Sequence, residues 1–513
     1  MTGLAALVAT VVATGVTGYR WLRVAQVEHY LPGAVTLVAA RWWSGLIVNA
    51  AIAAVALAVL VLGPVGGFVT LTLVAIGPLG LPLLGRTSKL RPTRRLKTLA
   101  VKWLALQGAL VAFLSIGMGL PLAMAGAIGA IAVPAVIDAA LLLLRPVENF
   151  VSARWARRAS QRLAEIGPTV VAITGSYGKT TTKALTAHLL SGARTVFASP
   201  ASWNNRAGLA KAVNEQLTPG TDVFVAEMGT YGPGEIADMC RWFPPDVAVI
   251  TAIGPVHLER FGSLDRTLTS KAEIVRGAAH VVLNVDDERL SALAHRLGGA
   301  PEGASGSVTV WPCSAVDEAA DVAVIPVDGG NLRVCVRGAH VADVPGASAA
   351  PTNLACAVAA ALACGMTTQQ LAARLKQPLP VPEHRLSRTT GAKGFAILDD
   401  TFNANPAGAL RALDALRSVD GDGRKVVVTP GMVELGPLQD EANEAFAAAA
   451  SELASHLVVV GMTNRRALLR GASGTGLKTV TVHNREAAVE WVKSTLGPGD
   501  TVLYENDLPD TYP

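Results

Sequence analysis

A short glycine-rich stretch carries the strongest chemical signal in this sequence. Residues 172–182 read AITGSYGKTTT, between a β-branched run and an apolar-periodic helix. Glycines let backbone N–H groups close around a phosphate, a lysine supplies a point charge, and a threonine hydroxyl can bind Mg²⁺. The spacing is shorter than in the common phosphate-binding loop, but its setting between a strand and a helix is the required one. The predicted phosphate loop comprises Thr174, Gly175, Ser176, Tyr177, Gly178, Lys179, Thr180 and Thr181.

Two further polar residues follow predicted strands. Glu227 ends the apolar run DVFVAE, and His257 comes shortly after the run DVAVITAIG. The carboxyl ends of parallel strands meet at one edge of a sheet, so both side chains are expected near the phosphate loop, where a second metal could sit. Taken singly, each residue is more often structural. Lys271, on the predicted helix DRTLTSKAEIV, would be a surface lysine on these grounds alone.

The composition indicates a membrane portion. The chain has 513 residues, of which 51% are hydrophobic and only 16% charged, which is too apolar for an ordinary soluble enzyme. Its formal net charge is only +5, and the basic residues crowd between and just after the apolar runs. This pattern favours a role at a membrane surface over nucleic-acid binding. The five cysteines form no C-x-x-C pair, which argues for reduced thiols and against a disulfide framework or a zinc site.

The apolar runs predict five membrane spans within residues 1–150. One run precedes Arg20, residues 42–85 carry no charge and are broken by GPVGG at 63–67, and residues 103–144 are broken near GMGLP at 117–121. Basic residues fall in every second connection, so the positive-inside rule places the N-terminus outside and everything after residue 145 in the cytoplasm. Asp138 lies in the last run, where we expect a structural carboxylate. The cytoplasmic loop VEHYLPG at 27–33 is expected to be solvated.

Six stretches together resemble a known family. They are TGSYGKTTTK, NNRAG, AEMGTYGPGEI, HLERFGSLDRTLTSKAEI, DDTFNANP and GMVELG, in this order. Over about residues 168–510 the sequence resembles the Mur ligase family, and most of all its D-alanyl-D-alanine-adding branch. The resemblance implies a central ATPase domain and a Rossmann-like C-terminal domain. It also implies that ATP phosphorylates a substrate carboxylate and that an amine then attacks the acyl phosphate, leaving an amide, ADP and phosphate.

The resemblance also assigns roles to individual residues. It implies that Lys179 holds the β and γ phosphates of ATP, and that Thr180 and Glu227 bind a first Mg²⁺. His257 would bind a second Mg²⁺, helped by Lys271 after carbamylation by CO₂, which turns a cation into a carboxylate. Residues expected at the nucleotide are Asn353 in TNLACAVAAAL, Arg385 in PEHRLS and Asp400 in LDDTFNANP.

The departures from the family pattern concern the substrates. The aspartate before M-x-E-L-G is Gly431 here, and a Lys-Gly-Ser-Arg turn that would receive a dipeptide carboxylate is replaced by TVLYENDLPDTYP. An edge lined by Glu505, Asp507 and Asp510 would repel a carboxylate. The membrane bundle stands where the family has its domain for the UDP-sugar.

These observations predict an α-helical transmembrane bundle at 1–150, followed by two α/β domains, a P-loop central ATPase domain at 151–385 and a Rossmann-like domain at 386–513. A basic helix, SARWARRASQRLAEIGP, would join membrane to enzyme and end at Pro168, and residues 300–345 would form an antiparallel excursion. We expect a ligase in the cytoplasmic membrane that uses ATP and Mg²⁺ to join an envelope-precursor carboxylate, carried on a lipid, to an amine. Its other partners would be membrane lipids, and no nucleic acid is expected.

Two alternatives remain open. One is an amino-acid polymer synthase of the poly-γ-glutamate type, which also combines a membrane anchor with this core. The other is a ligase-like scaffold that binds nucleotide without catalysis, although a scaffold needs none of Lys179, Glu227 and Lys271.

Overall fold

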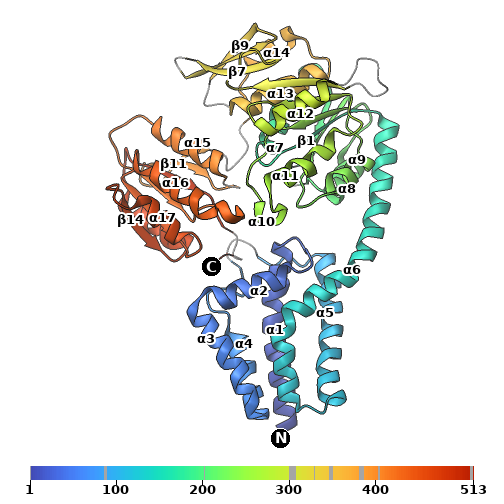
Figure 1. Cartoon of the computed structure of the whole chain (residues 1–513), viewed down its shortest axis with the longest axis vertical. Coiled ribbons are helices and arrows are strands. Elements are labelled where there is room, and N and C mark those ends of the chain that lie inside the picture. Colours follow the sequence, from blue (N-terminus) through green and yellow to red (C-terminus); the bar gives the residue numbers. More distant parts are fainter. Residues whose placement is uncertain are drawn as a thin grey trace. The chain divides into compact units, whose positions relative to one another are not determined.

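The computed structural model describes residues 2–85, 89–200, 203–299, 308–327, 330–345, 350–380, 386–402, 405–508 and 512. The chain forms two compact units, one of Met1–Phe150 with Leu508–Pro513 and one of Val151–Asp507. Figure 1 shows that the first is helical and the second is built of sheets and helices. Two residues with predicted roles, Arg385 and Asp510, lie outside the described residues, as does the predicted domain boundary near 385, which stays a prediction.

The described residues of the first unit form helical segments, the last of which continues into the second unit. They are α1 (Thr2–Val27), α2 (Ala34–Gly45), α3 (Ile47–Ala58), η1 (Val59–Leu62), α4 (Pro64–Ile76), α5 (Arg94–Ala112), η2 (Phe113–Gly117) and α6 (Leu122–Ile166).

The helix lengths do not support five full spans. Among the described residues three helices are long and apolar enough to cross a membrane, Gly3–Val27, Arg94–Gly117 and Leu122–Ile166, and a fourth span requires counting a pair bent by 104°, Ala34–Gly45 with Ile47–Leu62. The uncharged run 42–85 is divided by breaks at Leu46 and Gly63, and α4 has only 13 residues. At about 1.5 Å per residue α4 is roughly 20 Å long, shorter than the roughly 30 Å of a hydrocarbon core.

Two arginines expected in a cytoplasmic connection lie inside α1 instead. Arg20 is 3% exposed and Arg23 is 0% exposed. Arg20 donates to the carbonyl oxygens of Gly77, Ala75 and Ile76, the last two at 3.2 and 3.4 Å. Arg23 donates to the carbonyl oxygen of Pro82 at 2.7 Å. These guanidinium groups satisfy backbone carbonyls where α4 ends, which explains how charged residues are accommodated in an apolar helix.

Asp138 has the structural role expected of it, with a partner that the sequence did not suggest. Its Oδ2 accepts from the backbone N and the Oγ1 of Thr36, at 2.8 and 2.6 Å. Thr36 lies in the first turn of α2, whose N-cap residue, Gly33, offers no side chain. A carboxylate is favoured at a helix N-terminus by the free N–H groups and by the helix dipole. Asp138 of α6 therefore caps α2.

The predicted separate linker helix is part of a longer helix. α6 runs without interruption over 45 residues and contains Pro134 and Pro146. It ends at Ile166 because Gly167 takes a positive φ of 68° and donates its N–H to the carbonyl of Leu163 at 2.8 Å. Pro168 follows this stop and is not the residue that ends the helix.

The second unit begins with a nine-stranded sheet in the order β2-β3-β1-β4-β5-β6-β7-β8-β9. The strands are β1 (Thr169–Thr174), β2 (Val196–Ala198), β3 (Val223–Glu227), β4 (Val247–Ile250), β5 (His280–Asn284), β6 (Thr309–Ser314), β7 (Val322–Val327), β8 (Asn331–Val336) and β9 (Ala339–Pro345). The neighbours from β2 to β7 pair in parallel, and β7, β8 and β9 pair antiparallel. The predicted antiparallel excursion is thus confirmed for 322–345, while β6 continues the parallel sheet.

Helices cover both faces of this sheet. They are α7 (Lys179–Leu190), α8 (Arg206–Gln216), α9 (Glu235–Trp242), α10 (Leu258–Phe261), α11 (Leu264–Lys271), η3 (Ala272–Val275), α12 (Glu288–Gly298), α13 (Pro351–Ala363) and α14 (Thr368–Leu375). One core joins the sheet to α7, α13 and α14, and the other joins it to α8, α9, α12 and the end of α6. Burial on both faces explains why strands such as β3 are apolar without alternation.

A six-stranded sheet follows, in the order β10-β11-β15-β12-β13-β14. Its strands are β10 (Ser387–Thr390), β11 (Ala396–Asp400), β12 (Lys425–Thr429), β13 (His456–Val460), β14 (Lys478–Val482) and β15 (Thr501–Glu505). Its helices are α15 (Pro406–Arg417), η5 (Gly436–Leu438), α16 (Gln439–Ser451), α17 (Arg465–Ala472) and α18 (Arg485–Thr495). Only β10 pairs antiparallel, so the carboxyl ends of β11, β15 and β12 meet at one edge. This is the predicted Rossmann-like arrangement.

Candidate active site

The phosphate loop connects β1 to α7, as the sequence predicts. Gly175 has φ 151° and Gly178 has φ 84°, a region that L side chains rarely adopt. A Cβ on Gly178 would lie 2.3 Å from Oδ1 of Asn353, and one on Gly175 would lie 2.0 Å from Oγ1 of Thr251. Gly178 is also the N-cap of α7 and supplies no side chain to its first N–H groups. The loop therefore presents the start of a helix to an anion.

Residues after β4 hold the loop in this shape. Ser176 donates its backbone N–H to Ala252 at 2.8 Å and its hydroxyl to the carbonyl of Gly254 at 3.1 Å. Thr251 donates its hydroxyl to the carbonyl oxygens of Thr174 and Tyr177. The loop is thus rigidly supported before any phosphate binds.

Glu227 lies directly beside the start of α7. Its Oε2 accepts from Oγ1 of Thr180 at 3.1 Å and from Nζ of Lys183 at 3.0 Å, and its Oε1 accepts from Nδ2 of Asn204 at 3.2 Å. Burial alone would raise the pKa of Glu227, but the charges of Lys183 and Lys179 outweigh it and lower the pKa. Glu227 is consequently a buried anion in a site with two lysines.

The sequence analysis missed Lys183 and Asn204 as site residues. Both lie inside stretches that carry the resemblance, TGSYGKTTTK and NNRAG, and Lys183 follows Lys179 by one helical turn. Lys183 is only 5% exposed. A second lysine on the same helix face as the loop lysine was the available signal.

Lys179 lies at the centre of the charges in this site. Its Nζ donates to the carbonyl of Gly175 at 2.8 Å. Its charge lowers the pKa of both Glu227 and Lys271. The structure therefore brings Lys179, Thr180, Glu227 and Lys271 into one electrostatic environment.

Lys271 is not the surface residue that its sequence context alone would suggest. It ends α11, is 3% exposed, and its Nζ lies 5.9 Å from the centre of the Phe261 ring. Burial, and then the charge of Lys179, lowers the pKa of Lys271 well below its ordinary value. Its amine is therefore biased toward the neutral form.

His257 has a different neighbour from the one expected. It lies after β4 with φ 59°, and its Nδ1 is in a short contact with Oε2 of Glu434, which follows β12 and also has a positive φ. Arg260 approaches Oε1 of the same carboxylate at 3.5 Å, and the ring of Tyr231 lies 5.1 Å from the His257 ring. His257 and Glu434 thus connect the two sheets of this unit through side chains.

Asn353 lies beside the phosphate loop. It is in the first turn of α13, is 7% exposed, and packs against Gly178. Asp400 ends β11 at the carboxyl edge of the second sheet, and its carbonyl accepts from the N–H of Asn506 at 3.1 Å. The structure places both residues at strand or helix ends where a ligand can reach them.

Glu505 and Asp507, two of the three residues expected to form a repelling acidic edge, do not present free charges, and the third, Asp510, lies outside the described residues. Glu505 is 0% exposed, and its Oε2 accepts from Oγ1 of Thr429 at 2.6 Å. Burial, with a further contribution from Asp400, raises the pKa of Glu505 to about 8, so at neutral pH it is mostly uncharged. Asp507 pairs with Arg485. Because Glu505 is buried and Asp507 is paired, neither presents a free negative charge that would repel a substrate carboxylate.

The residues present fit Mg²⁺ at one position. A hydroxyl and a carboxylate, from Thr180 and Glu227, lie 3.1 Å apart, and Mg²⁺ typically takes one or two such protein ligands beside phosphate and water. Among the described residues no group of three or more His, Cys, Asp or Glu gathers that could hold a metal by itself. The site therefore suits an ion that arrives with a nucleotide.

Comparison with known proteins identifies these two sheets. Residues 173–307 match the Mur ligase middle domain, and residues 384–504 match the glutamate ligase domain of Mur ligases.

A UDP-N-acetylmuramoyl-tripeptide–D-alanyl-D-alanine ligase of Mycobacterium tuberculosis is 33% identical over 380 residues, which cover 68% of this chain and 72% of that protein. The corresponding ligase of Bacillus subtilis is 29% identical over 282 residues, covering 54% and 59%. The crystal structure of the MurF ligase from Thermotoga maritima in complex with ADP superimposes with a TM-score of 0.57 and 26% identity, covering 69% of this chain and 80% of that one. The similarity to these proteins supports the expected use of ATP and Mg²⁺. It gives no support to the carbamylation expected at Lys271.

Proposed function

We propose, for this chain that belongs to the Mur ligase family, a membrane-bound ligase acting on a peptidoglycan-related envelope precursor. As a member of this family, it is an ATP-dependent enzyme that forms amide bonds. The observation that carries the proposal is the group formed at the phosphate loop by the buried Glu227 and the half-buried Lys179 and Thr180. A nucleotide-binding scaffold would not require a buried carboxylate held between two lysines.

The site residues divide between nucleotide, metal and acyl phosphate. We assign the ATP phosphates to the N–H groups of residues 175–181 and to Lys179, and Mg²⁺ to Thr180 and Glu227. Asn353, Arg385 and Asp400 remain the proposed nucleotide contacts. His257 is proposed near the transferred phosphoryl group, positioned by Glu434. Positive charge on both sides of the carboxylate and phosphate would stabilise the developing acyl phosphate.

Lys271 is assigned here as a buried amine rather than a carbamate. Burial and the charge of Lys179 both disfavour a charged lysine at this position. Incubation of the enzyme with isotopically labelled CO₂ and detection of a carbamate signal by NMR would contradict this assignment. A Lys271→Ala variant that loses the signal would identify the site.

The substrates are the finer part of the proposal. The relatives are named for UDP-N-acetylmuramoyl-tripeptide and D-alanyl-D-alanine. In this chain the first of the two family matches begins at residue 173, after a helical unit, and the second begins at residue 384. We propose that the carboxylate donor is carried on a lipid, because a tail in the bilayer raises the donor concentration at a membrane-tethered site. The acceptor would be an amine other than the free dipeptide, because TVLYENDLPDTYP stands in place of the Lys-Gly-Ser-Arg turn.

A direct assay separates these substrates. Purified enzyme in detergent is given ATP and Mg²⁺ with either UDP-linked tripeptide plus D-alanyl-D-alanine or a lipid-linked precursor plus a panel of amines, and phosphate release is measured. We expect turnover of the lipid-linked precursor. Efficient turnover of the UDP-linked pair instead would make this a tethered form of the relatives' activity.

A further inference from the structure

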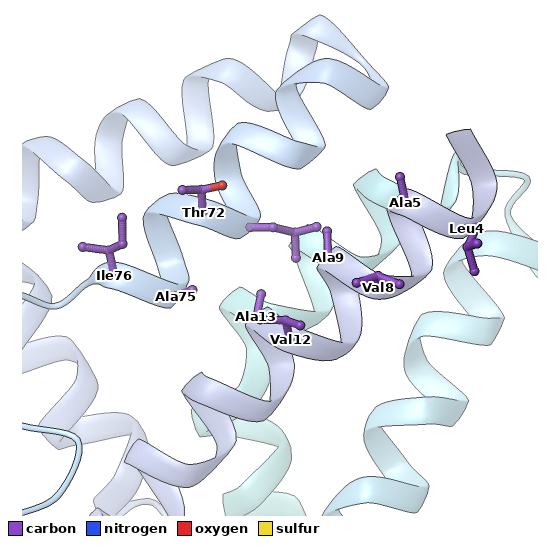
Figure 2. A pocket seen from close by; sticks show the side chains of 10 residues that line it. Leu4, Ala5, Val8, Ala9, Val12, Ala13, Thr72, Ala75 and Ile76 are labelled. Atoms are coloured by element: carbon purple, nitrogen blue, oxygen red, sulfur yellow. The ribbon is translucent and has the colours of Figure 1, made fainter. Parts of the chain in front are cut away.

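A large apolar groove lies between α1 and α4, which pack together in the helical unit. Its volume is about 720 Å³, and Figure 2 shows the side chains that line it. From α1 they include Val8, Val12 and Ala13, and from α4 Thr72, Ala75 and Ile76. Apart from the hydroxyl of Thr72, every lining side chain is a hydrocarbon. A groove of this kind between membrane helices is a suitable place for a hydrocarbon chain.

The groove ends beside a buried guanidinium. Ala75 and Ile76 line the groove with their side chains, and their carbonyl oxygens accept from NH2 of Arg20 at 3.2 and 3.4 Å. Arg20 lies on α1, two helical turns beyond Ala13, so the same two helices supply the apolar walls and the charge. The groove therefore has one end that differs chemically from the rest.

The charge of Arg20 is not balanced by its hydrogen bonds. In the part of the chain that the structure describes, its acceptors are the carbonyl oxygens of Gly77, Ala75 and Ile76, which carry no formal charge. Its Nε is buried and has no hydrogen-bond partner within the described ranges. A buried cation in apolar surroundings attracts an anion strongly, and a guanidinium suits the oxygens of a phosphate.

We propose that the groove between α1 and α4 binds the hydrocarbon chain of a lipid whose phosphate headgroup lies at the Arg20 end. The occupant is a single-chain lipid phosphate, because one apolar groove leads to one buried guanidinium. The inference deepens the proposed function, on which it rests for the idea that the donor is lipid-linked. It places the lipid anchor of that donor within the helical unit.

The test uses the full-length enzyme in detergent and a photoreactive polyprenyl monophosphate as the probe. Competition by unlabelled polyprenyl monophosphate should be at least about tenfold stronger than competition by the neutral polyprenol. Val8→Trp, which fills the groove, should weaken labelling by a similar factor. Val101→Trp on α5 is the matched control, since Val8 and Val101 are 54% and 67% exposed, and it should label like the wild type.

Arg20→Gln should reduce labelling by the photoreactive polyprenyl monophosphate. The concentration of polyprenol needed to compete with the labelling that remains should be the same as in the wild type. If this variant does not fold, as judged by gel filtration, Val8→Trp and the headgroup comparison still decide. The proposal would be overturned if polyprenol, or a two-chain anionic phospholipid, competed as strongly as polyprenyl monophosphate. Equal labelling of the Val8→Trp and Val101→Trp variants would also overturn it. Lys179→Ala should label normally, because the phosphate loop takes no part in lipid binding. If the wild-type enzyme is labelled as expected but releases no phosphate with the lipid-linked precursor, the proposed function fails and this inference stands.

Discussion

Lys179 and Lys183 lie one turn apart on α7 but have different tasks. Lys179 belongs to the phosphate loop, and Lys183 forms a buried ion pair with Glu227 at 3.0 Å. Removing one partner of a buried pair leaves an uncompensated charge, whereas removing a lysine that faces a ligand leaves the fold intact. Substitution at the two positions should therefore separate catalysis from stability.

We expect Lys179→Ala to abolish phosphate release with little change in thermal unfolding, because its charge is needed for ATP and for the transition state. Lys183→Met should lose activity and also destabilise the protein by about 3–5 kcal/mol. Lys211→Ala is the control, since its side chain is 50% exposed in a surface pair with Glu215. Full complementation by Lys179→Ala would remove the enzyme interpretation.

The protonated carboxyl of Glu505 predicts a dependence of stability on pH. Its pKa of about 8 in the folded protein is raised from the ordinary value of 4.5. Between these two values the unfolded chain has lost the proton that the folded chain retains, so stability is complete below the lower value and is lost as pH rises through the higher one. Glu505→Gln cannot ionise and should escape this loss.

The measurement is thermal unfolding of wild type and Glu505→Gln at about pH 5 and about pH 9. The variant should gain in unfolding temperature relative to the wild type as pH rises. Parallel pH profiles of the two proteins would show that Glu505 is ionised in the folded state.

At the scale of elements, the turn from β1 into α7 depends on close packing as well as on glycine conformation. Gly178 and Gly220 both have φ 84°, but a Cβ on Gly178 would lie 2.3 Å from Asn353, whereas one on Gly220 would meet nothing within 4 Å. Gly178→Ala should abolish ATP binding, measured by calorimetry. Gly220→Ala should retain it and lose only about 1–2 kcal/mol of stability from backbone strain. Equal ATP affinity in the two variants would show that the contact with Asn353 is unimportant.

The sequence predicts an element correctly when its local residue pattern matches the place that the element takes in the fold. The β-branched run before Gly175 became β1, and Glu227 and Asn353 reached the loop because strand and helix ends gather at one sheet edge. The sequence does not show which polar side chains are buried by segments far away along the chain. Nothing local indicates that Glu505 would be enclosed or that Asp138 would cap α2.

The predicted number of membrane spans differs from the helix lengths for a related reason. Hydropathy measures how long an apolar stretch is, but not where it bends, and the breaks at Leu46 and Gly63 leave α4 too short to span. Arg20 looked like a loop residue because a charge usually marks a helix end. The carbonyls beyond α4 provide its partners instead, and only the folded helices bring them together.

For the whole molecule, the shorter α4 leaves the predicted orientation unchanged. α3, continued by η1, leads to Gly63, and α4 packs back against α3, so these two segments return to their starting side whether or not they cross completely. With α1, α5 and α6 as full spans, an outside N-terminus still places residues after α6 in the cytoplasm, where ATP is available. The five-span prediction and the arrangement with three full spans differ only in how far residues near Gly63 reach across the membrane.

Cysteine labelling in intact cells distinguishes them, with the native cysteines replaced by serine. Met118→Cys, in the connection between α5 and α6, should react rapidly with an impermeant reagent. Val65→Cys should react slowly, because α4 is about 20 Å long and its start would remain within the hydrocarbon layer. Lys89→Cys should react only after permeabilisation. Rapid labelling at residue 65 would restore two full spans in 42–85, and labelling at residue 89 in intact cells would invert the protein and separate its catalytic unit from ATP.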